Sequence, residues 1–172
     1  EAPRGLRVFR AALPPGPGLH FSARRPRRGG RKRGHVVRPG DSLLHYRFLD
    51  TLGEGGGGVV WRALDTRLNR EVAVKFVPES IAGSEEALAR LGREAQALAA
   101  LNHANIVTVY AVEEAEGHRF LAMELVRGET LEGALPPDGF PVERVLELAA
   151  PLADALAAAH ERGVVHRDLK PR

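Results

Sequence analysis

Hydrophobic and polar positions alternate in short blocks between residues 45 and 126, which is typical of β-strands. Three blocks, residues 45–55, 58–66 and 68–78, are separated by glycine or turn residues. Two more, residues 106–114 and 118–126, flank a short turn that contains glycine. Because such short connections do not permit crossovers, the pattern predicts antiparallel pairing.

Apolar residues then recur at steps of three and four, the spacing of an amphipathic helix. The first such segment follows Ser84, a suitable N-cap residue, and places Leu88, Leu91, Ala95 and Leu98 on one face. The order of the pattern up to residue 126 is therefore three strands, one helix and two strands.

A longer helical pattern covers residues 142–161 and is followed by Gly163, a residue type that commonly ends helices. Pro151 lies inside it and removes one backbone hydrogen bond, so we expect a kink or a division of the helix. We expect its apolar positions to pack against further helices; the leucines among them are Leu146, Leu148, Leu152 and Leu156. The predicted fold class is α+β: a five-stranded antiparallel sheet with one helix, followed by the start of a mostly helical part.

Charge is distributed unevenly along the chain. Residues 1–36 contain ten Lys and Arg and one acidic residue, whereas the remainder has a net charge of −6. The basic part is rich in Arg, Pro and Gly and has no helix or strand period, so residues 1–39 are predicted to be a disordered basic tail. Its cluster at residues 24–35 has the charge to bind phosphate backbones but lacks interleaved aromatic residues, and we do not expect nucleic-acid binding.

The chain has no cysteine, which excludes disulfides, thiolate metal sites and a cysteine nucleophile. The longest apolar stretch, residues 142–160, contains several charged residues, so no membrane span is predicted. These features agree with a cytoplasmic protein, and a membrane anchor beyond residue 172 is compatible with them.

The sequence GEGGGGVV is the first candidate site. Gly53, Gly55, Gly58 and Val60 form a G-x-G-x-x-G-x-V pattern, and glycines let backbone amides approach phosphate oxygens closely. Alone, the pattern is equally typical of a flexible hairpin. The absence of Lys and Ser/Thr after Gly58 excludes a Walker A loop. A predicted strand rather than a helix follows, which excludes a dinucleotide fingerprint.

Two charged residues are predicted to act together near this loop. Lys75 ends the sequence VAVK and shares a strand face with Ala73, from which it can reach a phosphate at the loop. Glu94 lies on the apolar face of the first helix, where a carboxylate needs a cation. We predict that it pairs with Lys75; a surface pair with Arg90 is the alternative.

The sequence HRDLKP follows the second helix and supplies the last candidates. Lys170 lies two residues after Asp168, on the same side, where it could neutralise a transferred phosphate. The motifs GEGGGGVV, VAVK, Glu94, MELV and HRDLKP occur in the order found in protein kinases. From about residue 40 to its end, the sequence resembles the eukaryotic-like Ser/Thr protein kinases, most closely the bacterial ones.

This resemblance implies ATP-dependent phosphorylation of Ser/Thr hydroxyls on protein substrates, with ATP and Mg²⁺ as cofactors. Lys75 would hold the α- and β-phosphates, Glu94 would orient Lys75, and Asp168 would accept the proton of the substrate hydroxyl. The implied catalytic residues are Asp168, Lys170, Lys75 and Glu94.

The resemblance also implies a set of ATP-binding residues. Val60 and Ala73 would pack on adenine, Met123 would be the gatekeeper, and the backbones of Glu124 and Val126 would bond the adenine edge. Including the glycine loop and a ribose contact, the set is Leu52, Gly53, Glu54, Gly55, Gly58, Val60, Ala73, Lys75, Met123, Glu124, Val126 and Glu129.

By the same resemblance, residues 46–172 would form a kinase domain, with an amino lobe at 46–126 and the beginning of a carboxyl lobe at 127–172. The metal-binding Asn of the family would be residue 173 and the D-F-G Asp would lie later, so no metal ligand is expected within the chain. We expect an amino-terminal fragment that is poorly soluble and inactive alone. The alternative is a non-catalytic ATP-binding or scaffold fragment.

Two residues depart from the family pattern. Gly57 stands where bacterial relatives usually have Met, and we expect it to loosen the loop. Ala104 replaces the usual proline of HPNIV. Neither change removes a catalytic group.

Overall fold

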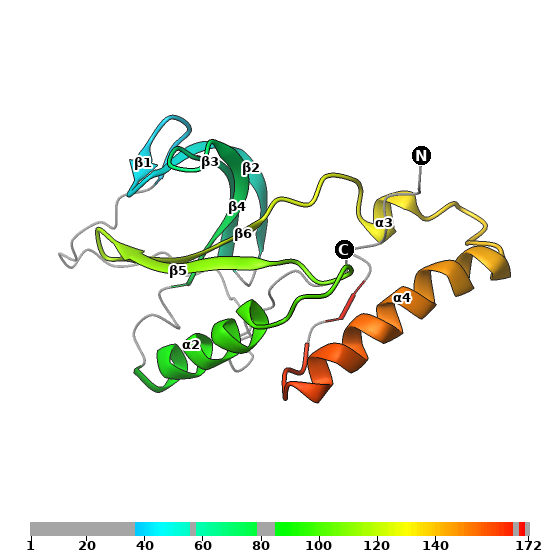
Figure 1. Ribbon diagram of the computed structural model, residues 1–172. Coiled ribbons are helices and arrows are strands. Elements are labelled where there is room, and N and C mark those ends of the chain that lie inside the picture. The colour runs from blue at the N-terminus through cyan, green and yellow to red at the C-terminus, as the bar shows by residue number, and fades with distance from the viewer. Residues whose placement is uncertain (1–36, 56–57, 79–84, 167–168, 171–172) are drawn as a thin grey trace, which may run out of the picture.

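A six-stranded antiparallel sheet with the strand order β1-β2-β3-β4-β6-β5 is the largest element of the structure (Figure 1). The structure is a computed structural model that describes residues 37–55, 58–78, 85–166 and 169–170. The strands are β1 (Ser42–Leu43), β2 (Tyr46–Gly55), β3 (Gly58–Asp65), β4 (Arg70–Phe76), β5 (Val109–Ala115) and β6 (His118–Glu124). All five predicted strands are present. The prediction missed β1 because two residues carry no detectable alternation.

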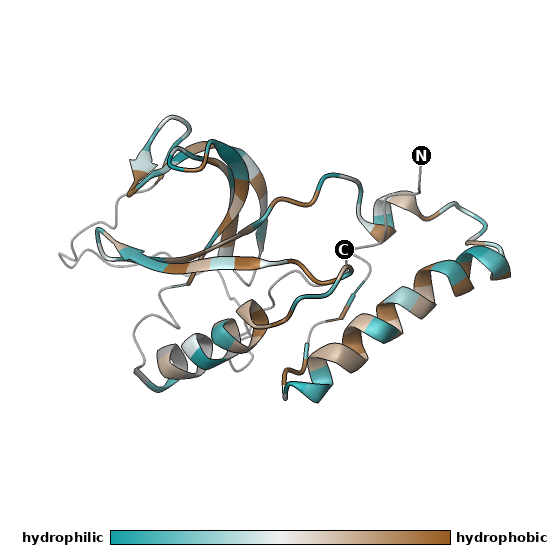
Figure 2. Ribbon diagram, viewed as in Figure 1, coloured by the Kyte–Doolittle hydropathy of each residue, from teal (hydrophilic) through white to brown (hydrophobic). Residues whose placement is uncertain are grey.

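The sheet buries residues on both of its faces. On one face, Val72 and Val74 are fully buried with the aromatic rings of Phe48, Trp61 and Phe120. The opposite face contributes Ala73 to a second cluster, which also contains residues from the helices. Figure 2 shows the hydrophobic positions along the curled strands. The predicted division of VAVK between two strand faces is therefore confirmed.

Helix α2 (Glu85–Ala99) packs on the second cluster through its apolar face. Ala95 and Leu98 are buried there, as the helical spacing predicts. The predicted N-cap Ser84 and the side chains of Leu88 and Leu91 lie outside the described residues.

Two helices follow β6. The short helix α3 (Leu131–Ala134) was not predicted; the hydroxyl of Thr130 caps it by accepting the Gly133 N–H at 3.1 Å. The long helix α4 (Val142–Glu161) has the predicted bounds. Pro151 lies inside α4 without dividing it, so of the two expected effects the division is wrong, and the kink stays a prediction.

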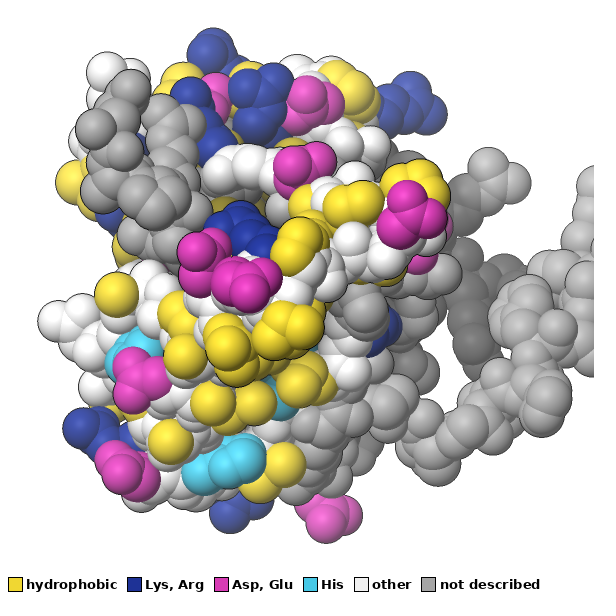
Figure 3. Space-filling view, turned by 90° about the vertical axis from the view of Figure 1, so that its right-hand side faces the viewer, with side chains coloured by type: hydrophobic (Ala, Val, Ile, Leu, Met, Phe, Trp, Pro, Cys, Tyr) yellow, Lys and Arg dark blue, Asp and Glu magenta, His cyan; other side chains and the backbone are white. Residues whose placement is uncertain are grey.

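Helix α4 has one buried and one exposed apolar side. Ala155 and Ala159 are fully buried against the sheet-side cluster, and Leu156 packs partly against the same cluster. Leu156 was expected to pack against further helices, and in this respect the expectation is wrong, since Leu156 already packs against this cluster. On the other side, Leu146, Val142 and Val145 are 63%, 69% and 46% exposed. Figure 3 shows hydrophobic side chains gathered on this face of the molecule.

The predicted basic tail is almost entirely outside the described residues, so its disorder stays a prediction. Of its last residues, Val37 packs against the aromatic cluster, and the N–H of Arg38 donates to the Asp41 carboxylate at 2.8 Å. Within the part of the chain that the structure describes, no helix combines the length and apolar character needed to cross a membrane.

Gly58 is required by the approach of β3 to β4. Its φ is +99°, and a Cβ built on it would lie 2.4 Å from the carbonyl oxygen of Phe76. Because that oxygen belongs to the backbone of a central strand, it cannot move aside cheaply. The third glycine of the loop is thus fixed by the sheet itself, independently of any ligand.

We predict that Gly58→Ala lowers the free energy of unfolding by at least about 2 kcal/mol, because it adds a clash to an unfavourable φ. Gly92→Ala is the matched control: Gly92 lies inside α2, has no positive φ, and has open space around its Cβ position. The control should raise the free energy of unfolding by about 0.5–1 kcal/mol. Chemical denaturation of the full chain measures both, and equal effects of the two substitutions would contradict the assignment.

Candidate functional site

Neighbouring positions on one face of the sheet hold the core of the candidate site. In the strand register, Val60 of β3 lies opposite Lys75 of β4, and Ala73 of β4 lies opposite Met123 of β6. Directly opposite residues of antiparallel strands point to the same face. The structure therefore brings together the residues predicted for the lysine, the adenine contacts and the gatekeeper.

Lys75 is a buried cation on this face. It is 6% exposed, and its cross-strand neighbours Val60 and Leu121 are apolar. Burying an ammonium group among apolar side chains is costly unless anionic or polar groups face it. The backbone of Glu94 lies in α2, one residue before the buried Ala95, but its side chain is outside the described residues. The Lys75–Glu94 ion pair therefore stays a prediction.

The glycine turn adjoins this face at the end of β2 and the start of β3. Gly53, Glu54 and Gly55 pair with Val60, Val59 and Gly58 respectively. The register of β2 shifts between Thr51 and Gly53, and Leu52, at this irregularity, is 47% exposed. Gly57 and its expected effect on the loop lie outside the described residues.

The segment after β6 forms the edge of the site. The N–H of Glu124 donates to the carbonyl of Thr108 at 2.9 Å, and the Glu124 carboxylate accepts the N–H of Thr108 at 3.4 Å. Because its N–H is used within the protein, an adenine contact at Glu124 must use the carbonyl. Val126 is 43% exposed, and Glu129 is also exposed next to the N-cap of α3.

The candidate segment after α4 starts from a well-defined helix end. Gly163 has φ +73°, and its N–H donates to the carbonyl of His160 at 2.9 Å. The N–H of Val164 donates to the carbonyl of Ala159 at 3.0 Å, which completes a Schellman motif. Val164 and His166 are buried, so the chain direction into HRDLKP is fixed. Asp168 lies outside the described residues.

Lys170, at the far end of the same motif, is described and exposed. Its predicted role in neutralising a transferred phosphate is not tested by the structure.

The α2–β5 loop joins α4 to the sheet. His103 Nδ1 accepts the N–H of Asn105 at 3.2 Å, so its Nε2 carries the proton and donates to Asp154 of α4 at 3.0 Å. The Arg162 guanidinium also donates to the carbonyl of Ala100 at 3.4 Å. Sequence reasoning noticed this loop only for Ala104 and missed these contacts, since the partners are more than 50 residues apart.

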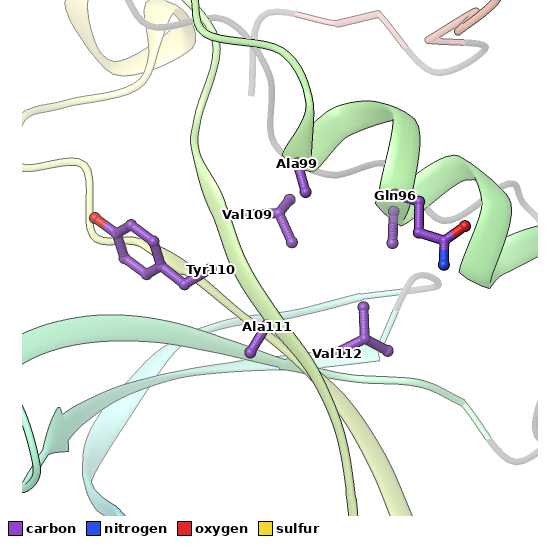
Figure 4. A pocket seen from close by; sticks show the side chains of 7 residues that line it. Gln96, Ala99, Val109, Tyr110, Ala111 and Val112 are labelled. Carbon is purple, nitrogen blue, oxygen red and sulfur yellow. The ribbon is translucent and has the colours of Figure 1, made fainter.

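A shallow groove of about 210 Å³ lies elsewhere, between α2 and β5 (Figure 4). None of the predicted nucleotide-binding residues lines it; its lining residues are Ala95, Gln96, Ala99, Val109, Tyr110, Ala111 and Val112. Among the described residues, no group of three His, Asp or Glu side chains could hold a metal ion. The described side chains therefore do not fit Mg²⁺ as a complete site.

The model of the family described as "Protein kinase domain" matches residues 46–172, and the chain belongs to this family. The predicted resemblance to bacterial Ser/Thr protein kinases is confirmed at the family level. The serine/threonine-protein kinase PknL of Mycobacterium tuberculosis is 42% identical over 133 residues, which cover 76% of this chain and 33% of PknL. For PknB of Mycobacterium leprae the identity is 41% over 131 residues, covering 73% of this chain and 21% of PknB.

The fold is also similar to solved kinase structures. The PknI kinase domain of Mycobacterium tuberculosis matches with a TM-score of 0.71 and 29% identity, over 79% of this chain and 55% of that chain. The predicted kinase-like α+β fold is thus confirmed. The chain spans 33% and 21% of the lengths of the curated relatives PknL and PknB.

We predict that Gly163→Ala lowers the free energy of unfolding by about 1–2 kcal/mol, because an alanine must adopt the left-handed conformation there. Gly163→Asn is the matched variant and should lose less, since asparagine tolerates this conformation. Denaturant unfolding of the full chain gives both values. A loss for Gly163→Asn as large as that for Gly163→Ala would show that the backbone conformation is not the cause.

Proposed function

We propose that this chain supplies the ATP-binding part of a Ser/Thr protein kinase that phosphorylates protein hydroxyls. The observation that carries the proposal is the buried Lys75 on the same sheet face as Val60, Ala73 and Met123, beside the glycine turn. Apolar side chains next to a cation suit a nucleotide, because the base needs apolar contact and the phosphates need positive charge.

The proposed roles are those that the resemblance to protein kinases implies. Val60 and Ala73 contact the adenine from the sheet, and Met123 closes the back of the site. Lys75 binds the α- and β-phosphates beneath the glycine turn, and Glu94 orients Lys75. The backbone of residues 124–126 bonds the adenine edge, and Glu129 bonds the ribose.

The remaining roles concern phosphoryl transfer. Asp168 accepts the proton of the Ser/Thr hydroxyl, and Lys170 neutralises the transferred phosphate. Kinases of this family use Mg²⁺ with ATP, but we derive no step through the metal, since the described residues do not provide its ligands. Residues 46–126 would form the amino lobe and residues 127–172 would begin the carboxyl lobe.

Nucleotide binding is the direct test of this proposal. We predict that Lys75→Met weakens binding of ADP to the full chain by about 10-fold or more, because a charge-assisted hydrogen bond contributes about 1.5–3 kcal/mol. Lys170→Met is the control, because Lys170 is proposed to act only on the transferred phosphate. It should leave the dissociation constant unchanged in a calorimetric titration.

Two outcomes would count against the proposal. If the wild-type chain binds no ADP, the site is not a nucleotide site in this chain. If Lys75→Met binds ADP as tightly as the wild type, the phosphate role of Lys75 is wrong. Binding without transfer to a protein substrate, in a chain extended through the D-F-G segment, would favour the non-catalytic scaffold instead.

A further inference from the structure

Four charged side chains of alternating sign form a continuous chain across strands β2, β3 and β4 to the segment after β6. The Arg62 guanidinium makes two hydrogen bonds to Asp50, Nε to Oδ1 at 2.8 Å and NH2 to Oδ2 at 2.9 Å. Its NH1 donates to Glu71 Oε1 at 2.8 Å. The other oxygen of Glu71 accepts from Arg127 NH2 at 2.7 Å. We call these residues the charge chain.

The strand register explains how they meet. Asp50 of β2 lies opposite Arg62 of β3, and Arg62 lies opposite Ala73 of β4. Glu71 is two residues before Ala73 on the same strand, so both point to one face. The charge chain therefore continues the face that carries the proposed adenine contacts.

Arg127 brings the segment after β6 into this arrangement. It lies three residues beyond Glu124, the last residue of β6, and directly follows residues 124–126, whose backbone is proposed to bond the adenine edge. Its guanidinium reaches back over the sheet to Glu71 of β4. A contact between these two residues fixes the distance between the segment and the central strand.

We expect the charge chain to contribute more stabilisation than an isolated surface ion pair. Single exposed pairs contribute little, but bidentate arginine contacts and networks are the exception. Glu71 is 28% exposed and uses both of its oxygens. The pKa of Asp50 lies below its usual range because Arg62 donates hydrogen bonds to it, and the bond to Asp50 raises the pKa of Arg62.

We propose that the charge chain holds residues 125–128 against the sheet and thereby sets the entrance of the nucleotide site. Arg62, Glu71 and Arg127 are then positioning residues for the nucleotide, which they do not touch themselves. The inference rests on the proposed function only for its effect on nucleotide affinity. Its structural part, the restraint on residues 125–128, holds without a ligand.

The test uses Arg127→Gln, Glu71→Gln and the double variant, with Arg119→Gln as the matched control. Arg119 pairs with Glu114 at 2.6 Å on the β5–β6 hairpin, and the two side chains are 36% and 60% exposed. The control thus removes a similar exposed ion pair at the opposite end of β6 from residues 125–128. Thermal midpoints of all variants verify that they fold.

Two readouts are measured at low salt: amide hydrogen exchange of residues 125–128 without nucleotide, and the dissociation constant for ADP. We expect Arg127→Gln and Glu71→Gln to speed the exchange several-fold and to weaken ADP binding by about 2- to 5-fold. The double variant should be no worse than the more affected single variant, because both substitutions break the same contact. Arg119→Gln should change neither readout.

The readouts separate the inference from the proposed function. Unchanged exchange in both single variants overturns the restraint, whatever happens to ADP. Faster exchange with unchanged ADP affinity overturns the positioning role. If the wild-type chain binds no ADP, the proposed function fails, and so does the positioning role, while the exchange data still decide whether the charge chain restrains the segment.

Discussion

The free-energy cost of burying the Lys75 ammonium group limits which groups can surround it. An ammonium group that is 6% exposed, between Val60 and Leu121, is stable only where other groups supply the interactions that water would have made. Its position on a central strand fixes where such groups can lie: at the glycine turn on one side and along α2 on the other. A ligand that carries phosphates meets this requirement and adds apolar contact through its base. A buried cation beside an apolar surface is also suited to binding a ligand that carries both phosphates and a base.

Close packing within the sheet fixes the position of Lys75. Strand β3 passes so close to the carbonyl of Phe76 that only a glycine fits at residue 58. Phe76 is the residue directly after Lys75, so the start of β3 is held against the strand that carries the lysine. The glycine therefore serves the geometry of the sheet as well as access to phosphate. The glycine pattern, which in the sequence suggests a flexible turn, includes one glycine that allows two strands to pack closely.

Local sequence patterns predicted the longer strands and helices, but they did not predict contacts between residues far apart in the sequence. Alternation located the five longer strands and the helical period located α2 and α4, because each repeats over several turns or pairs. Strand β1, with two residues, and helix α3, with four, are too short for a period to show. Pro151 was expected to kink or divide α4; the helix is not divided, and Ala155 and Ala159, beyond Pro151, pack against the sheet-side cluster.

In the candidate site, too, some features could be predicted from local sequence patterns and others could not. Lys75, Ala73 and Val60 share a face because of strand periodicity, which the sequence shows directly. The charge chain depends on the register between β2, β3 and β4, and a shift of one residue would place Arg62 on the opposite face. The contact of His103 with Asp154 joins residues on different elements, 51 positions apart. Such pairs follow from the folded arrangement and leave no trace in local spacing.

The α2–β5 loop links the two halves of the site in one packed unit. Leu101, Ile106 and Val107 from this loop belong to the same buried cluster as Ala155 and Ala159 of α4. The two buried residues of α4 are both alanines, so the helix can approach the cluster closely, and a larger side chain at either position would overpack it. The end of α4 then directs Val164 and His166 into buried positions. The loop thus couples the strands to Val164 and His166 at the end of α4, so a displacement of α4 would move these two residues relative to Lys75.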